Sequence, residues 1–142
     1  MQQALAEARA AGERGEVPVG AVIVQNGTII AAAGNEVEGS SLASAHAEVL
    51  AIQRASAALG QKWLQDCDLY VTLEPCPMCA GAISLARLRR VYYGAADPKS
   101  GGVDHGPRVF SQSTCHHAPE VIAGVDETEC SALLKAFFAD RR

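Results

Sequence analysis

The sequence has no long hydrophobic run and no segment typical of an export signal. No uninterrupted apolar stretch approaches the roughly 20 residues that cross a bilayer. The residues after Met1 also lack a basic segment followed by an apolar one. We therefore expect a protein that is neither embedded in a membrane nor secreted, and a cytoplasmic location.

An excess of positive charge is missing, and so is a cysteine pattern typical of disulfides. The 12 Lys and Arg residues are outnumbered by 16 Asp and Glu residues, so the net charge of −4 gives no general attraction to polyanions. Any nucleic-acid partner must therefore be held by a local basic patch. The five cysteines are odd in number, and in a reducing cytoplasm their thiols remain available to a metal.

The composition is that of a globular protein. The chain has 142 residues, of which 49% are hydrophobic and 20% are charged. This length is in the usual range of one domain and is enough to bury a core without disulfides. We expect a single domain.

Stretches with helical and strand-like patterns alternate along the chain. The clearest is a β-hairpin over 19–24 and 28–33, because the Asn26-Gly27 pair between these runs favours a tight turn. Helices are predicted over 1–11, 45–58, 77–89 and 127–139, the first of them ending at Gly12. Strands are predicted over 68–73, 90–94 and 121–125, and loops over 35–44 and 97–107. A hairpin joined to βαβ units predicts an α/β fold with one mixed sheet flanked by helices.

Cys76 and Cys79 form a Cys-x-x-Cys pair at the junction between a predicted strand and a predicted helix. Pro77 suits the first turn of that helix, which puts Cys76 near the N-cap and Cys79 in the first turn. The positive end of the helix dipole stabilises thiolates, and thiolates both bind zinc and attack disulfides. The spacing alone is therefore compatible with a metal site, a redox pair or a purely structural use.

His46 is the histidine best suited to complete a metal site with this pair. A catalytic zinc site has three protein ligands and leaves the fourth position to water. His46 alone among the four histidines begins a predicted helix directly after a loop, and Glu48 follows two residues later. A lone histidine of this kind is more commonly a surface or core residue. Together with Cys76 and Cys79, however, the better interpretation is a metal ligand. Because two residues differ by about 200° around an α-helix, His46 and Glu48 must lie at the helix tip to face one pocket.

Taken together these residues form a specific motif. His46-Ala47-Glu48 followed by Pro75-Cys76-Pro77-Met78-Cys79 resembles the H-x-E…P-C-x-x-C signature of the zinc-dependent nucleobase deaminases, a family whose chemistry is known. Over nearly its full length the chain is similar to the bacterial tRNA-specific adenosine deaminases of the zinc-dependent cytidine/deoxycytidylate deaminase family. Other matching stretches are 16–22, 34–35, 70–75, 80–82 and parts of 129–138.

The resemblance implies a fold, an assembly and a reaction. The fold is a three-layer α/β/α, cytidine-deaminase-like arrangement with a mixed central sheet flanked by helices, in one deaminase domain over 1–142. The assembly is a homodimer. The reaction is the hydrolytic deamination of adenosine to inosine at the wobble position of tRNA, with the target base flipped out of the anticodon loop.

The resemblance also implies a metal and a catalyst. One zinc ion per chain is held by His46, Cys76 and Cys79, and it lowers the pKa of its bound water from about 15.7 to near 7. The resulting hydroxide attacks the ring carbon that carries the amine. Glu48 takes the water proton, protonates the ring nitrogen and delivers a proton to the departing ammonia.

Three further residues are implied to bind the substrate. Asn35 would use its side-chain amide, and the first helical turn would offer backbone N–H groups such as that of Ala47. Asp97 corresponds to an aspartate on the loop beside the flipped nucleotide. Without the resemblance, Asn35 and Asp97 are ordinary turn residues.

Some features do not fit the family pattern or remain unexplained. Ala96 stands where the best-known relatives carry a basic residue, which removes one phosphate contact. The basic patch would come from scattered cations, of which Arg141 and Arg142 are the best placed by analogy; the other candidates are Arg87, Arg89, Arg90, Lys99, Arg108 and Lys135. A second metal site at His116-His117 is disfavoured, because adjacent side chains in a strand point in opposite directions.

Three alternatives stay open. A free-base deaminase of the same fold, acting on guanine, cytosine or a related heterocycle, is favoured by the acidic net charge and Ala96. A non-enzymatic protein with a structural zinc would want four ligands, whereas the sequence offers a coherent three. A thiol oxidoreductase would need neither His46 nor Glu48.

Overall fold

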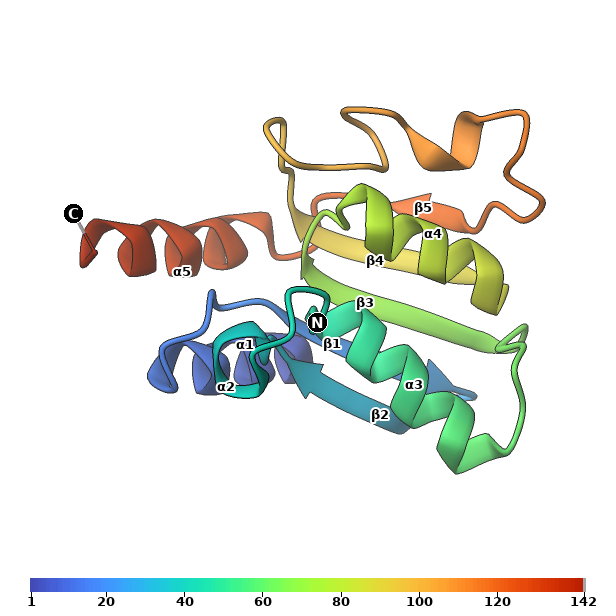
Figure 1. Cartoon of the computed structure of the whole chain (residues 1–142), viewed down its shortest axis with the longest axis horizontal. Helices are drawn as coiled ribbons and strands as arrows, with labels where there is room; N and C mark the ends of the chain where they lie inside the picture. The colour runs from blue at the N-terminus through green and yellow to red at the C-terminus, as the bar shows by residue number, and fades with distance from the viewer. Residues whose placement is uncertain (142) are drawn as a thin grey trace.

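The computed structural model describes residues 1–141, and Arg142 lies outside the described part. Within it the chain forms one five-stranded sheet with helices around it (Figure 1). The elements in chain order are α1 (Gln2–Glu13), β1 (Gly20–Gln25), β2 (Thr28–Gly34), α2 (Val37–Ser40), α3 (Ala47–Leu59), β3 (Cys67–Leu73), α4 (Pro77–Ala86), β4 (Arg90–Ala95), a 3₁₀ turn (Val109–Ser111), β5 (Glu120–Ile122) and α5 (Glu127–Ala139).

The sheet is mixed, as the sequence predicts. Its strand order is β2-β1-β3-β4-β5. β1 pairs antiparallel with both β2 and β3, while β4 runs parallel to β3 and to β5. The hairpin turns at Asn26 and Gly27, which both have positive φ, as its tight two-residue turn requires.

Helices cover both faces of the sheet, which confirms the three-layer prediction. α3 packs on β1 and β2 with α4 beside it, and α1 and α5 pack on strands of the same sheet. Because neighbouring side chains along β1 point to opposite faces of the sheet, α3 and α4 cover one face and α1 and α5 cover the other. Ala21 and Ile23 lie in the core that includes Ala47 and Ala51 of α3, whereas the α-carbon of Gly20 lies directly against α1.

Several boundaries differ from the predictions, among them those of α3, which begins at Ala47 and not at 45, and of β5, which ends at Ile122 and not at 125. Gly12 does not end α1, which continues to Glu13, and the chain turns instead at Gly15, whose φ of +87° favours glycine. α4 ends at Ala86, three residues early, because Arg87 adopts a left-handed conformation. The segment 35–44, predicted to be a loop, contains the short helix α2.

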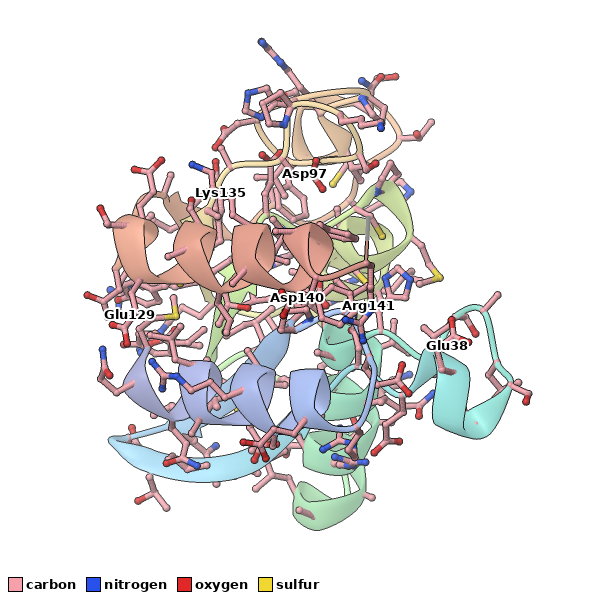
Figure 2. All side chains as sticks on the ribbon, turned by 90° about the vertical axis from the view of Figure 1, so that its left-hand side faces the viewer. Glu38, Asp97, Glu129, Lys135, Asp140 and Arg141 are labelled. Carbon is pink, nitrogen blue, oxygen red and sulfur yellow. The ribbon has the colours of Figure 1, made fainter. Side chains whose placement is uncertain are left out.

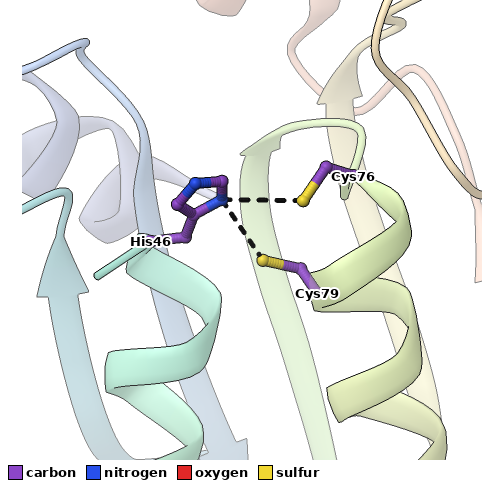
Figure 3. Close-up of side chains that lie close together, drawn as sticks. All are labelled: His46, Cys76 and Cys79. Carbon is purple, nitrogen blue, oxygen red and sulfur yellow. Dashed lines mark hydrogen bonds between the residues drawn. The ribbon is translucent and has the colours of Figure 1, made fainter. Parts of the chain in front are cut away.

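The polar ends of two helices meet at one end of the sheet. β3 ends at Leu73, and the N-termini of α3 and α4 lie beside each other there (Figures 1 and 3). None of the helices in the described residues is both long and apolar enough to cross a membrane.

Candidate active site and metal centre

The N-termini of α3 and α4 present the residues of the predicted motif. His46 is the N-cap of α3 and has an extended backbone, with φ −76° and ψ 149°. Cys76 is the N-cap of α4 with φ −70° and ψ 170°, and Pro77 is the first helical residue. Cys79 follows in the first turn, so the predicted placement of both cysteines is confirmed.

Three possible metal ligands converge between these helix ends (Figure 3). His46 Nδ1 lies 3.6 Å from Cys76 Sγ and 3.5 Å from Cys79 Sγ. Within residues 1–141 this is the only set of three His, Cys, Asp or Glu residues whose ligand atoms all lie within 4.8 Å of one another. One imidazole nitrogen and two sulfurs, without a fourth protein ligand, fit the ligand set of an open zinc site.

The two thiols share their protons unequally. The hydrogen bond between them favours a thiolate at Cys76 and lowers its pKa to about 4, in spite of partial burial. The same hydrogen bond, helped by burial, raises the pKa of Cys79, which keeps its proton. The Cys76 hydrogen bond also raises the pKa of His46. A metal bound here must therefore displace protons from this cluster.

Glu48 lies beside the cluster without joining it. Its side chain is in the first turn of α3, is only 4% exposed and lines the same cavity as His46. Burial is the main reason that its pKa rises to about 7. Because His46 is in the extended N-cap position, the two-residue spacing brings both side chains to one pocket, as the sequence argument requires.

The cavity has a volume of about 230 Å³ and is lined by both predicted polar substrate residues, Asn35 and Asp97. The Asn35 side chain accepts a hydrogen bond from the Ala47 N–H at 2.8 Å and donates one to the Val17 carbonyl at 3.2 Å. The Asn35 side chain and the Ala47 N–H, both predicted to bind the substrate, are thus hydrogen-bonded to each other at the N-terminus of α3. Their roles toward a substrate remain predictions.

The whole chain matches a known family. A profile of the MafB19-like deaminases covers residues 1–142. The chain is 56% identical over all of its 142 residues to the tRNA-specific adenosine deaminase of Agrobacterium fabrum, of which the match covers 93%. The chain belongs to the tRNA-specific adenosine deaminase family. This confirms the resemblance drawn from the motifs.

Further relatives of this deaminase agree in sequence and in fold. The tRNA-specific adenosine deaminase of Bacillus subtilis is 49% identical over the whole chain and 88% of its own length. A solved tRNA:A34 deaminase, studied for A-to-I editing at the wobble position of transfer RNA, is 57% identical with a TM-score of 0.93, covering 94% of this chain and 97% of that one. A guanine deaminase from Bacillus subtilis is 35% identical with a TM-score of 0.67, covering 99% and 90%.

A wider groove adjoins the cavity of this deaminase. It has a volume of about 810 Å³ and shares Val17, Leu73, Asp97 and Ser100 with the cavity. Lys99 and Lys135 line it together with the half-exposed ring of Phe138. Figure 2 shows Lys135 and Asp97 on the same side of α5.

The terminal arginines occupy a different place from the groove. The Arg141 guanidinium lies 3.6 Å from the centre of the Phe137 ring, in a hollow between α5 and α1. Figure 2 shows Arg141 on the α1 side of α5, away from Lys135. Arg142 lies outside the described residues. The groove is lined by Lys99 and Lys135, two of the scattered cations that the sequence offered for a basic patch, and not by Arg141.

Sequence reasoning missed two buried carboxylates beside the cavity. Glu16 accepts hydrogen bonds from the N–H groups of Glu38 and Gly39 in α2. Glu74 accepts them from the loop that follows β4; these bonds outweigh burial, so that its pKa is lowered. The available indication for Glu74 was a charged residue directly after an apolar strand, where a carboxylate needs partners.

Proposed function

We propose that this chain converts adenosine to inosine by hydrolysis at the wobble position of a tRNA anticodon. The observation that carries the proposal is a cavity in which His46, Cys76 and Cys79 converge beside buried Glu48. It occurs in a chain 56% identical over its whole length to a tRNA-specific adenosine deaminase. The editing reaction studied in the similar tRNA:A34 deaminase supports the same conversion.

The three converging ligands suit one zinc ion per chain. An imidazole and two thiolates are ligands that zinc prefers, and three protein ligands leave a position for a reacting molecule. The N-termini of α3 and α4 favour the deprotonated sulfurs that such a site needs. When bound, zinc supplies a Lewis acid that lets water lose a proton near neutral pH.

Glu48 is proposed to move the protons of the reaction. Burial raises the pKa of its carboxylate in the metal-free site, and a positioned carboxylate beside the cavity is suited to take up and release protons. It takes one proton from the attacking water and gives it to purine N1. It then transfers the second water proton to the exocyclic amine, which leaves as ammonia while the water oxygen becomes the C6 oxygen of inosine.

Asn35, Ala47 and Asp97 are proposed to hold the base. Before a base enters, the Asn35 amide is fixed by its bonds to Ala47 and Val17. We expect this amide to exchange its bond to Val17 for the edge of the purine. Asp97 lines the cavity and the groove alike, so it lies where a base in the cavity joins the rest of a strand.

The adjoining groove favours a polynucleotide over a free base. Lys99 and Lys135 offer positive charge for phosphates, and the Phe138 ring offers a surface on which a flanking base stacks. One observation favours a second candidate, the deamination of free guanine. It is the 35% identity to the guanine deaminase of Bacillus subtilis over 99% of this chain.

A parallel assay distinguishes the two candidates. The zinc-loaded protein is incubated with an anticodon stem-loop, free guanine and free cytosine, and the products are identified. We expect inosine from the stem-loop and no turnover of the bases. Turnover of a free base without turnover of the stem-loop would overturn the tRNA proposal and leave the deaminase chemistry intact.

The salt dependence of binding tests the role of the groove. Each phosphate contact to a single strand contributes a slope of about −0.7 to the plot of log affinity against log salt concentration. Replacing Lys99 and Lys135 by Ala should therefore flatten the slope by up to about 1.4. Lys62→Ala is the matched control, because Lys62 lies over the Trp63 ring and outside the groove. An unchanged slope in the double variant would show that the phosphates bind elsewhere.

We also propose that residues 1–142 form one deaminase domain that acts as a homodimer, in the cytoplasm where its tRNA substrate is found. Leu85 on α4 is 80% exposed and lies with Trp63 and Val109 around a hollow of about 380 Å³. Covering such a surface with a second copy is favourable. In analytical ultracentrifugation Leu85→Lys should give monomers, whereas Leu42→Lys, at an exposed leucine outside this hollow, should stay dimeric.

A further inference from the structure

The wall of the cavity opposite α3 is a loop without regular structure. Residues 96–108 connect β4 to the 3₁₀ turn, and they supply Asp97 and Ser100 to the cavity and Lys99 to the groove. A loop of this length has many conformations, and ordering it during binding would weaken affinity. Something must therefore hold it in place before a substrate arrives.

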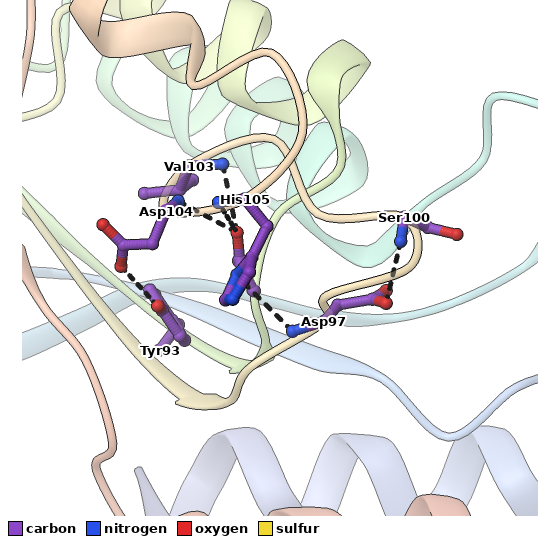
Figure 4. A network of polar contacts seen from close by, with 7 residues as sticks. Tyr93, Asp97, Ser100, Val103, Asp104 and His105 are labelled. Carbon is purple, nitrogen blue, oxygen red and sulfur yellow. Dashed lines mark hydrogen bonds and ion pairs between the residues drawn. The ribbon is translucent and has the colours of Figure 1, made fainter.

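Glu74 makes most of the contacts that hold this loop, and its partners Asp97, Val103, Asp104 and His105 are labelled in Figure 4. Its side chain is fully buried at the end of β3. One carboxylate oxygen accepts from the Asp97 N–H at 3.0 Å. The other accepts from the N–H groups of Val103, Asp104 and His105 at 3.2, 3.0 and 3.2 Å. The His105 ring nitrogen Nδ1 adds a contact of 2.7 Å to the first oxygen.

The loop wraps tightly around this carboxylate. A Cβ at Gly101 would lie 2.5 Å from the Glu74 oxygen and 2.5 Å from the Asp97 carbonyl, so no larger residue fits without a shift. The Gly102 N–H donates to the Pro75 carbonyl at 2.8 Å. The Asp97 carboxylate in turn accepts from the Ser100 N–H at 3.0 Å. The two ends of the loop are thus tied to the same carboxylate, and its middle is tied to the chain just before Cys76.

We propose that Glu74 is a positioning residue for substrate binding, which holds the 97–105 loop so that Asp97, Lys99 and Ser100 form a preordered wall. Glu74 lines the cavity, but its carboxylate is buried and bonded to the loop, so it acts through the loop. The inference rests on the proposed function, because it assigns the loop to substrate recognition. Hydrogen exchange measures the anchoring of the loop, and steady-state kinetics measure its part in recognition.

Glu74→Gln tests the anchoring by hydrogen exchange. A glutamine keeps the size of the side chain but has one oxygen fewer, so at least one backbone N–H of the loop loses its acceptor. A lost hydrogen bond to a charged group changes an equilibrium constant about tenfold or more. Peptides spanning 97–105 should therefore exchange about tenfold faster in the zinc-loaded variant. Unchanged exchange in these peptides would overturn the proposal.

Asp68→Asn is the matched control. Asp68 is a largely buried carboxylate at the opposite end of β3, where it accepts from Arg89 at 3.0 and 2.8 Å. This variant makes the same chemical change in the same strand and should leave the exchange of 97–105 unchanged. Faster exchange there in both variants would mean general loosening of β3 and would also overturn the proposal.

Steady-state kinetics test the link to recognition. For an anticodon stem-loop, Glu74→Gln should raise KM about tenfold while kcat changes less than about threefold. The loop of the variant must be ordered when the substrate binds, which weakens binding and leaves the chemical step unchanged. Zinc content should stay at the wild-type value. A fall in kcat with an unchanged KM would contradict a positioning role.

Gly101→Ala disturbs the same contact from the loop, because the added Cβ would lie 2.5 Å from the Glu74 oxygen, while residue 74 remains a glutamate. It should reproduce both the faster exchange of 97–105 and the rise in KM, even if Glu74→Gln folds poorly. If the wild-type protein does not turn over the stem-loop at all, the proposed function fails. If it does so while both variants keep the wild-type KM, the positioning role fails and the proposed function stands.

Discussion

The two ends of helix α4 both carry cysteine and histidine neighbours, yet they differ in what they can do. At its N-terminus lie His46, Cys76 and Cys79, which we call the amino-end cluster. At its C-terminus lie Ser84, Cys115 and His117, the carboxyl-end cluster, joined by a contact of 3.3 Å between Ser84 Oγ and Cys115 Sγ. The residue types are similar, but only the amino-end cluster has ligand atoms that converge.

The polarity of the helix explains the difference. A helix N-terminus presents free N–H groups and positive potential, which stabilise thiolates. A C-terminus presents free carbonyls, which attract donors. Beside this end of α4, the His117 ring donates to the Leu88 carbonyl at 2.7 Å and the Ser84 hydroxyl donates to the His117 carbonyl at 2.6 Å, both carbonyls lying outside the helix. In the carboxyl-end cluster each of the three side chains bonds to a backbone carbonyl, whereas in the amino-end cluster the His46 ring bonds to both cysteine sulfurs.

Removal of a ligand should give the largest effect. His46→Ala or Cys76→Ser should lose most of the zinc and with it the activity, because a three-ligand site has no spare ligand. His117→Ala should keep about one zinc per chain. Elemental analysis by mass spectrometry measures this directly. Full zinc content in His46→Ala would remove His46 from the site and erase the contrast between the clusters.

Removal of the proton shuttle should come next. Glu48→Ala should keep its zinc, because Glu48 does not belong to the converging set, but should lose about 10²-fold or more in kcat. Stem-loop turnover and zinc content are measured on the same sample, with Cys115→Ser as the comparison from the other cluster. Zinc that disappears together with Glu48 would make it a metal ligand instead of a proton shuttle.

Thiol reactivity after zinc removal sharpens the contrast further. Because the pKa of Cys76 is about 4, its thiolate is already formed at pH 5.5, and its alkylation rate should change less than about twofold up to pH 8. A thiol with an ordinary pKa near 8.5 gains more than about a hundredfold over that range. Mass spectrometry of iodoacetamide-treated protein gives the rate at each cysteine. A steep rise at Cys76 would show that the helix end and Cys79 do not stabilise its thiolate.

A smaller effect is expected on the stability of the metal-free protein. The pKa of Glu48 is about 7 when folded and near 4.5 otherwise, so the folded state binds the extra proton between these values. The contribution of Glu48 to the free energy of unfolding should therefore fall as the pH rises from about 4.5 to 7, by up to about 3 kcal/mol. The Cys76 thiolate, with a pKa of about 4, has the opposite effect over the same range, so the Glu48 contribution is obtained from urea titrations as the difference between the wild-type protein and Glu48→Gln, which should fall as the pH rises. Equal slopes in both proteins would place the titrating group elsewhere.

The smallest effect belongs to the carboxyl-end cluster. Ser84→Ala removes the hydrogen bond to the His117 carbonyl and should lower the free energy of unfolding by about 1 kcal/mol. Zinc content and kcat should be unchanged. A loss of zinc in this variant would mean that the two ends of α4 are coupled, which is the opposite of what their separate bonding predicts.

The sequence by itself determined the elements and the ligand set. The Asn26-Gly27 hairpin, the strand before Cys76, the mixed sheet and the helix tip at His46 all follow from local rules of turns, caps and periodicity. The motif residues were identifiable because two helix N-caps with Cys, His and Glu form a pattern that few other chemistries need.

Only the tertiary structure decided what surrounds that ligand set. Helix α1 continues past Gly12 to Glu13, and Arg141 lies over the Phe137 ring and does not line the groove. The groove lysines are 36 positions apart, and Glu74 bonds to a loop 23 to 31 positions away. Such contacts depend on how strands and helices pack, and no local pattern encodes them. The chemistry of the site could therefore be predicted from the sequence, whereas the shape and order of the cavity walls depend on long-range packing.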